Sequence, residues 1–119
     1  MGDIKQKTLV EKIIDLEKYT ETALTQSNYI RNQRFLLCTD IRKAISEILH
    51  LAIRAMKKYH KKTTLQDMDV EVEYLRWLIR ISHEKKYITC HRLDVWMRQV
   101  NEIGDMLGGW IKKENAKIK

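Results

Sequence analysis

The segment LCTDIRKAISEILHLAIRAMKKYH, residues 37–60, decides the fold of this 119-residue chain. Its apolar residues recur at alternating intervals of four and three, which is the period of an α-helix and not of a β-strand. Such spacing places one apolar stripe along a helix, and the stripe must be buried against other helices. The stripe consists of Leu37, Ile41, Ala44, Ile48, Leu51 and Ala55.

The same period recurs in three further stretches, within residues 9–23, 65–79 and 93–110. It predicts helices over roughly residues 4–26, 31–60, 65–85 and 90–113, with Thr64 and Thr89 as candidate N-caps of the last two. The connections are short, and helices joined by short connections run antiparallel. We therefore expect an all-α fold, an antiparallel up-down-up-down four-helix bundle, forming a single domain over residues 1–119.

Residues that break helices are scarce: the chain has no proline and four glycines, three of which fall between residues 104 and 109. A glycine inside a helix costs up to about 1 kcal/mol relative to alanine, so something should compensate. In one interpretation Gly108 and Gly109 simply end the last helix. In the other, Gly104 and Gly108 let a neighbouring helix or chain approach closely, while Trp96 and Trp110 fill the space around them.

The net charge of +7 is local, because residues 31–62 hold nine Lys and Arg against two Asp and Glu. A run of charge on a helix is often only a solvated face. The alternative is a stripe that contacts phosphates, which supplies affinity without sequence specificity. The basic side chains concerned are Arg31, Arg34, Arg42, Lys43, Arg54, Lys57, Lys58, Lys61 and Lys62.

The third predicted helix carries two further features. Arg76 and Arg80 lie four residues apart, and they form either a salt-bridge ladder with Glu73 and Glu84 or a pair of guanidinium groups presented to phosphate. The helix is also apolar on more than one side, which indicates either a wide stripe in a well-filled bundle or a surface for self-association. The additional apolar residues are Val70, Tyr74, Trp77, Leu78 and Ile81.

Catalytic and metal-binding patterns are weak. A two-metal carboxylate site in a bundle needs two Glu-x-x-His motifs, and the chain has one, Glu47 to His50, which flanks the apolar stripe. A zinc set built from Cys90, His91 and either His83 or Cys38 lacks the paired spacings of such sites. We therefore predict no enzyme activity, no metal and no cofactor.

The two cysteines are too few for a disulfide framework and indicate reduced thiols. No apolar run is long enough to cross a membrane, and residues 1–6 lack the apolar core that a secretory signal needs, so we expect no such signal. We therefore expect a cytoplasmic protein without a membrane partner.

Two segments carry a resemblance to a known family: YLRWLIR at residues 74–80 and VNEIGDMLGGWI at residues 100–111. They resemble the accessory variability determinant (Avd) proteins of diversity-generating retroelements, which are small basic four-helix bundles. The resemblance covers the whole helical layout, most specifically about residues 72–113, whereas the first helix matches in pattern alone.

The resemblance implies a homopentamer with a positively charged surface. It further implies binding to a reverse transcriptase and to RNA or DNA, in support of the mutagenic complementary-DNA synthesis that diversifies a target gene. On the matching positions, Arg76 and Arg80 become candidate basic contacts, and Trp77, Gly108 and Trp110 become packing positions. A related family, the bundle proteins of ribosomal RNA intervening sequences, suggests a protein-binding adaptor instead.

Overall fold

The computed structural model describes residues 2–117, with side chains from residue 6 onward, and the regular secondary structure in this part of the chain is entirely helical. Four long helices, α1 (Gly2–Gln26), α3 (Leu37–Lys57), α4 (Lys62–Glu84) and α5 (Cys90–Lys117), are accompanied by a single helical turn, α2 (Arg31–Phe35). The predicted four-helix bundle is confirmed. Residues 1, 118 and 119 of the predicted domain lie outside the described range.

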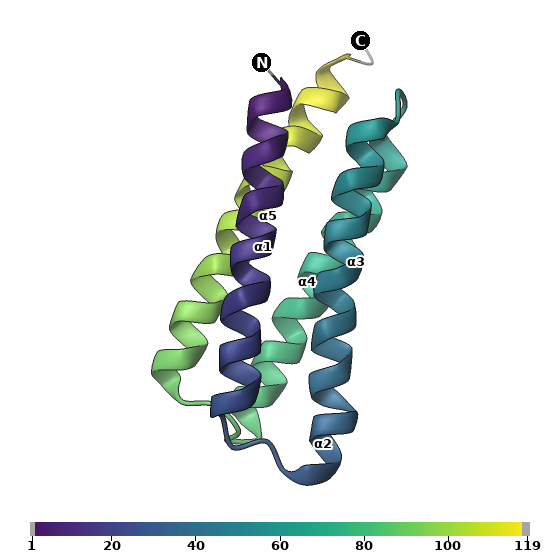
Figure 1. Cartoon of the computed structure of the whole chain (residues 1–119). Coiled ribbons are helices and arrows are strands. Elements are labelled where there is room, and N and C mark those ends of the chain that lie inside the picture. Colours follow the sequence, from purple (N-terminus) through teal and green to yellow (C-terminus); the bar gives the residue numbers. More distant parts are fainter. Residues whose placement is uncertain (1, 118–119) are drawn as a thin grey trace.

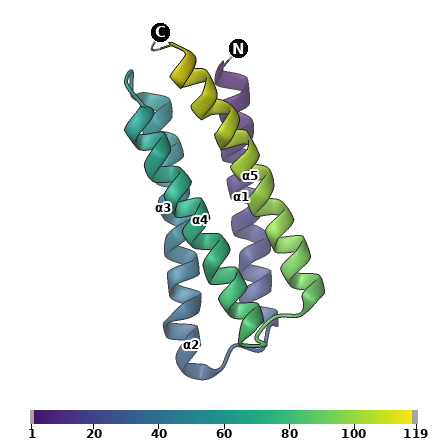
Figure 2. The same cartoon turned by 180° about the vertical axis from the view of Figure 1, so that it is seen from behind.

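The long helices form an elongated rod, 49 × 22 × 20 Å. Helix α1 packs against α3 and α5, and α4 packs against the same two helices, so each helix has two neighbours. Neighbouring helices run antiparallel, and the turn between α3 and α4 lies at the same end of the rod as the two termini (Figure 1). Figure 2 shows α4 and α5 in front of α3 and α1, which completes the four-cornered arrangement.

The core contains the predicted stripe of α3 together with the matching stripes of the other helices. Trp96 of α5 is fully buried, and its Nε1 donates a hydrogen bond of 3.0 Å to Thr20 Oγ1, also buried. The ring of Tyr19 meets the ring of Trp96 edge to face, with 6.5 Å between centroids. Burying one large apolar side chain contributes about 1.5–3 kcal/mol, so these stripes supply most of the stability.

The predicted helix over residues 31–60 is interrupted at Leu36, which separates α2 from α3. Arg34 explains the interruption, because its Nη1 donates to Leu24 O at 2.8 Å and its Nη2 donates to Ser27 O at 3.1 Å. These bonds satisfy carbonyl groups where α1 ends, and they tie α2 to α1 instead of aligning it with α3. The exposed side chains of Phe35 and Leu36 gain nothing from continuing the helix.

The same predicted helix also ends earlier than expected, at Lys57. The backbone of Lys58 is extended, with ψ of 145°. Six residues here, KKYHKK at 57–62, combine four lysines with no residue of the core stripe, and like charges one turn apart disfavour a helix.

The other helix bounds also shift. Helix α4 begins at Lys62, so Thr64 is a buried residue of its first turn and not its N-cap. Helix α5 continues to Lys117, so the interpretation in which Gly108 and Gly109 end it is wrong. Thr89 does cap α5: its Oγ1 accepts a hydrogen bond of 3.1 Å from Arg92 N.

Helix α4 ends in a Schellman motif without glycine. Lys86 has a positive φ of 65°, Lys86 N donates to His83 O, and Tyr87 N donates to Ser82 O, both at 2.9 Å. Glycine usually occupies this left-handed position because a Cβ is unfavourable there. The motif shows how α4 can end without a helix-breaking residue.

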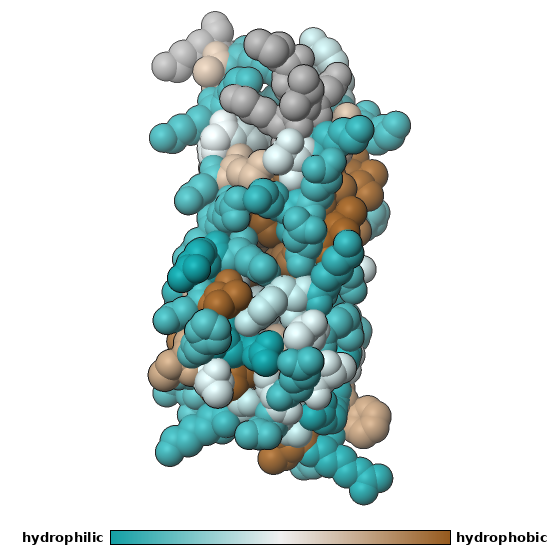
Figure 3. Space-filling view, turned by 60° about the vertical axis from the view of Figure 1, so that its left-hand side comes forward, coloured by the Kyte–Doolittle hydropathy of each residue, from teal (hydrophilic) through white to brown (hydrophobic). Residues whose placement is uncertain are grey.

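The outer surface is hydrophilic over most of the face seen in Figure 3, with separate hydrophobic patches. Among the described residues no helix is both long and apolar enough to span a membrane.

Candidate nucleic-acid interface

The strongest concentration of positive charge is the basic turn, defined as residues 57–62. Lys57, Lys58 and Lys62 are exposed and Lys61 is half-buried. In the described part of the chain the ion pairs are Lys12–Glu102, Arg42–Glu21, Arg76–Glu73 and Lys117–Glu114, and none involves the basic turn. The exposed lysines Lys57, Lys58 and Lys62 are therefore available to anions.

Lys61 also connects the turn to α5. Its Nζ lies 5.5 Å from the ring centroid of Trp110, a cation–π contact with a buried tryptophan. This contact brings Lys112 and Lys113 of α5, both exposed, to the same end of the rod as the basic turn.

The other basic side chains of α3 lie farther along the rod. Arg54 and Lys43 are exposed and lie eleven residues apart, about three helical turns, on one side of the helix. Lys43 also lines a shallow groove of about 410 Å³ between α3 and α4 with Asp40, Glu47 and Glu71. Burial raises the pKa of Glu71, and the nearby carboxylates of Glu47 and Asp67 raise it further.

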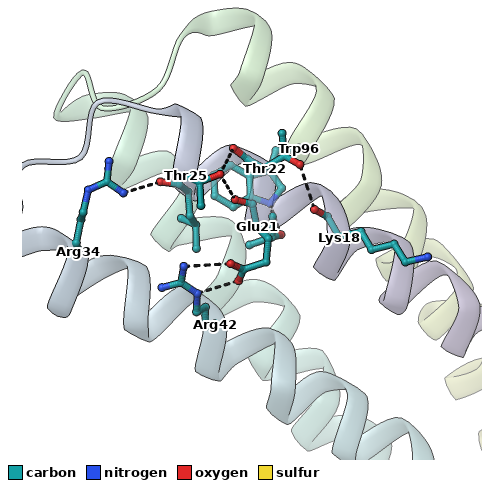
Figure 4. A network of polar contacts seen from close by, with 9 residues as sticks. Lys18, Glu21, Thr22, Thr25, Arg34, Arg42 and Trp96 are labelled. Carbon is teal, nitrogen blue, oxygen red and sulfur yellow. Dashed lines mark hydrogen bonds and ion pairs between the residues drawn. The ribbon is translucent and has the colours of Figure 1, made fainter.

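Arg42 points toward α1 instead. Its Nε donates to Glu21 Oε2 at 2.8 Å and its Nη2 donates to Glu21 Oε1 at 3.1 Å (Figure 4). The hydrogen bond from Arg42 lowers the pKa of the Glu21 carboxyl. Arg42 is thus held by Glu21 within the fold, unlike the lysines of the basic turn, which form no ion pair with any described residue.

Arg76 and Arg80 have different surroundings despite their helical spacing. The Arg76 side chain is 20% exposed, and it donates from Nε to Asn101 Oδ1 and from Nη1 to Glu73 Oε1, both at 2.9 Å. Arg76 therefore clamps α4 to α5. Arg80 is exposed, and its guanidinium lies 5.0 Å from the ring centroid of Trp77.

The three glycines of α5 also differ from one another. A Cβ at Gly104 would overlap Arg76 Nη2 and lie 3.4 Å from Arg76 Cζ, so this glycine makes room for the clamp. At Gly108 and Gly109 a Cβ would meet nothing within 4 Å. Within one chain, close approach therefore occurs at Gly104 alone among the three. Trp96 lies against Tyr19 and Thr20 of α1, and Trp110 lies beneath Lys61.

An apolar stripe on α4 remains uncovered within the chain. It comprises Val70, Tyr74, Trp77 and Ile81, whose intervals of four, three and four place them on one face of the helix. Trp77 is 54% exposed. We refer to these four residues as the α4 stripe.

Neither candidate metal pattern is brought together in full. Cys38 is buried and Cys90 is exposed, and His83 Nε2 lies 3.3 Å from Cys90 Sγ. Glu47 and His50 are both exposed on α3, and Glu47 lines the groove toward α4. Among the described residues no three His, Cys, Asp or Glu side chains are grouped as metal ligands.

The residue that sequence reasoning missed is Tyr59, which lies in the basic turn and is 91% exposed. The sequence held the signal, an aromatic residue between two pairs of lysines. The predicted helix over residues 31–60 includes Tyr59, so there was no reason to expect this ring in an exposed turn.

Fold and surface define a class of small, basic four-helix-bundle proteins with a lysine-rich turn at one end. A family model described as bAvd-like matches residues 4–114. The chain therefore belongs to the bAvd-like family, the bacterial Avd proteins. No curated protein matches the sequence significantly.

Proposed function

We propose that this chain is a non-enzymatic accessory protein of a diversity-generating retroelement. It acts in the cytoplasm, where it binds reverse transcriptase and RNA or DNA and supports mutagenic complementary-DNA synthesis without a cofactor. Membership of the bAvd-like family supports the retroelement context. The observation that carries nucleic-acid binding is the basic turn, whose four lysines form no ion pair within the described chain.

The basic side chains divide into two proposed roles. Lys43, Arg54, Arg80 and the lysines of the basic turn, Lys57, Lys58, Lys61 and Lys62, contact phosphates. Arg42 and Arg76 are held by Glu21 and by Glu73 with Asn101, so their first role is to orient helices. These two arginines can contact a phosphate only if they first release their bonds within the chain.

Salt dependence tests this assignment. Each neutralised phosphate contributes a slope of about 0.7 for single strands, or 0.9 for duplex, in log affinity against log salt. The triple variant R54Q/K57Q/K58Q should weaken binding and flatten the slope. The control K18Q/K85Q/R98Q removes the same charge from exposed positions outside the proposed set and should leave the slope unchanged. Equal effects of the two variants would contradict a localised interface.

Self-association is the second part of the proposal, and the α4 stripe supports it. An exposed apolar row of this kind needs a cover, and Tyr74 and Trp77 are its aromatic members. Trp96, Gly104 and Trp110 pack inside each chain, while Gly108 has open space above it that a second copy can fill.

A homopentamer of 14.3 kDa chains has a mass of about 72 kDa in light scattering. Trp77→Glu should lower that mass toward a single chain. Phe35→Glu, a charge placed on an exposed aromatic outside the stripe, is the control and should not. A wild-type monomer would contradict the proposal.

The alternative function is a protein-binding adaptor of the ribosomal RNA intervening-sequence type. The α4 stripe also favours this function, because an apolar row suits a protein partner better than a phosphate backbone. An adaptor would keep its protein partner when R54Q/K57Q/K58Q is introduced, and the wild-type chain would not bind nucleic acid.

A further inference from the structure

We propose that the basic turn binds single-stranded nucleic acid by stacking an unpaired base on Tyr59 while the flanking lysines contact the adjacent phosphates. The inference rests on the proposed nucleic-acid function and adds to it a site, a key residue and a preferred form of the ligand.

Tyr59 is a large aromatic side chain that contributes almost nothing to the fold. It is 91% exposed, and its ring meets the ring of the adjacent His60 edge to face, with 4.8 Å between centroids. This geometry leaves the faces of the Tyr59 ring uncovered by the core of the bundle. An exposed ring face is the surface on which a nucleobase stacks.

The charge around Tyr59 has one sign. Lysines occupy the two positions before Tyr59 and the two positions after His60, and no acidic residue occurs in the sequence between Glu47 and Asp67. Acidic side chains are also absent from the first turn of α4. At the same end of the rod, Glu114 is occupied by Lys117 at 3.2 Å, while Lys112 and Lys113 are exposed.

The backbone adds to this field. Helix α4 starts at Lys62, the last residue of the basic turn, and its N-cap residue, Lys61, makes no side-chain capping hydrogen bond. The first amide groups of a helix carry partial positive charge and favour an anion. The helix start supports phosphate binding here, but the exposed ring and the unpaired lysines define the site.

The exposed ring distinguishes single strands from duplexes. A base pair within a duplex hides both faces of each base against its neighbours, whereas an unpaired base can leave the stack and cover Tyr59. Lysines attract phosphates of either form, so they give affinity without this preference. A basic surface combined with an aromatic ring is the arrangement that proteins use for single strands.

Fluorescence anisotropy with a labelled 15-nucleotide DNA strand and with the matching duplex tests the proposal. Stacking of one base is lost in Tyr59→Ala, so binding of the single strand should weaken by about 5-fold or more. Tyr59→Phe keeps the ring and should restore binding to within 2-fold of wild type. Neither variant should change duplex binding or the salt slope, because stacking releases no counterions.

Phe35→Ala is the matched control, because it removes another exposed aromatic ring, 74% exposed, from α2 at the opposite end of the rod. It should leave binding unchanged. Thermal unfolding of all three variants should match wild type, since neither ring is buried.

The outcomes separate the two levels of the proposal. Failure of the wild-type chain to bind either probe overturns nucleic-acid binding and the stacking site together. Binding that Tyr59→Ala leaves unchanged, or that Phe35→Ala weakens equally, overturns the stacking site alone. Equal loss of single-strand and duplex binding in Tyr59→Ala also overturns it.

Discussion

The contact between Gly104 and Arg76 predicts that Gly104→Ala destabilises the chain when Arg76 is present and stabilises it when Arg76 is replaced by alanine. In the wild-type chain, Gly104→Ala places a Cβ where the Arg76 guanidinium lies. The guanidinium must move and release its bonds to Asn101 and Glu73. In an Arg76→Ala background the same substitution meets no guanidinium.

The magnitudes follow from the contacts. The hydrogen bond from charged Arg76 to Asn101 contributes about 1.5 kcal/mol, and the partly exposed pair with Glu73 about 0.5 kcal/mol. Alanine regains about 1 kcal/mol over glycine in the helix. Gly104→Ala should therefore destabilise the wild-type chain by about 1 kcal/mol and stabilise the Arg76→Ala variant by about 1 kcal/mol.

Urea unfolding followed by circular dichroism at 222 nm measures these differences. A change of 1 kcal/mol moves the midpoint by about 0.5 M urea for a slope near 2 kcal/mol/M. Protein concentration must be held fixed, because association adds to apparent stability.

Gly109→Ala is the control, since a Cβ there meets nothing within 4 Å. It should stabilise both backgrounds by about 1 kcal/mol. The reasoning is refuted if Gly104→Ala stabilises the wild-type chain as much as Gly109→Ala does, or if its effect is the same with and without Arg76.

Three further predictions concern stability. Lys86→Gly should raise the free energy of unfolding by about 1 kcal/mol in urea, because glycine accepts the positive φ without the cost of a Cβ. A lower free energy of unfolding would contradict this. Thr20→Val should lower the free energy of unfolding by about 1–3 kcal/mol, because the buried Trp96 Nε1 loses its hydrogen-bond acceptor. A melting temperature equal to wild type would contradict that. The pKa of Glu71 is raised in the folded state, so protonation favours folding and the ionised carboxylate opposes it at neutral pH. Glu71→Gln should therefore raise the melting temperature at pH 7, with a gain that disappears below the unfolded-state pKa near 4.5, and a gain independent of pH would refute this origin.

The sequence predicted the fold well because the spacing of the core residues depends on the helical period alone. Four helices that each carry one apolar stripe and are joined by short connections can pack in few ways, and an antiparallel bundle is one of them. The predicted helix ends were wrong where a tertiary contact or local charge outweighed the periodicity. The bonds of Arg34 to the end of α1 interrupt the second helix, and the lysine-rich turn ends it at Lys57.

The candidate surface was predictable in location but not in detail. Counting charge found residues 31–62, yet composition cannot distinguish a paired arginine from an unpaired lysine. Arg42 and Arg76 have partners on other helices, and those partners depend on the register of packing. Tyr59 was missed because its exposure depends on where α3 ends.

The position of the basic turn at one end of a rod has a consequence for assembly geometry. In the proposed homopentamer, cyclic symmetry about an axis parallel to the rod would give every copy the same orientation, so all basic turns would fall on one rim. One rim would then carry every copy of the lysine-rich basic turn. A strand that crossed several basic turns on that rim would gain from effective concentration at each further contact, so its affinity would grow with strand length faster than a single chain would allow.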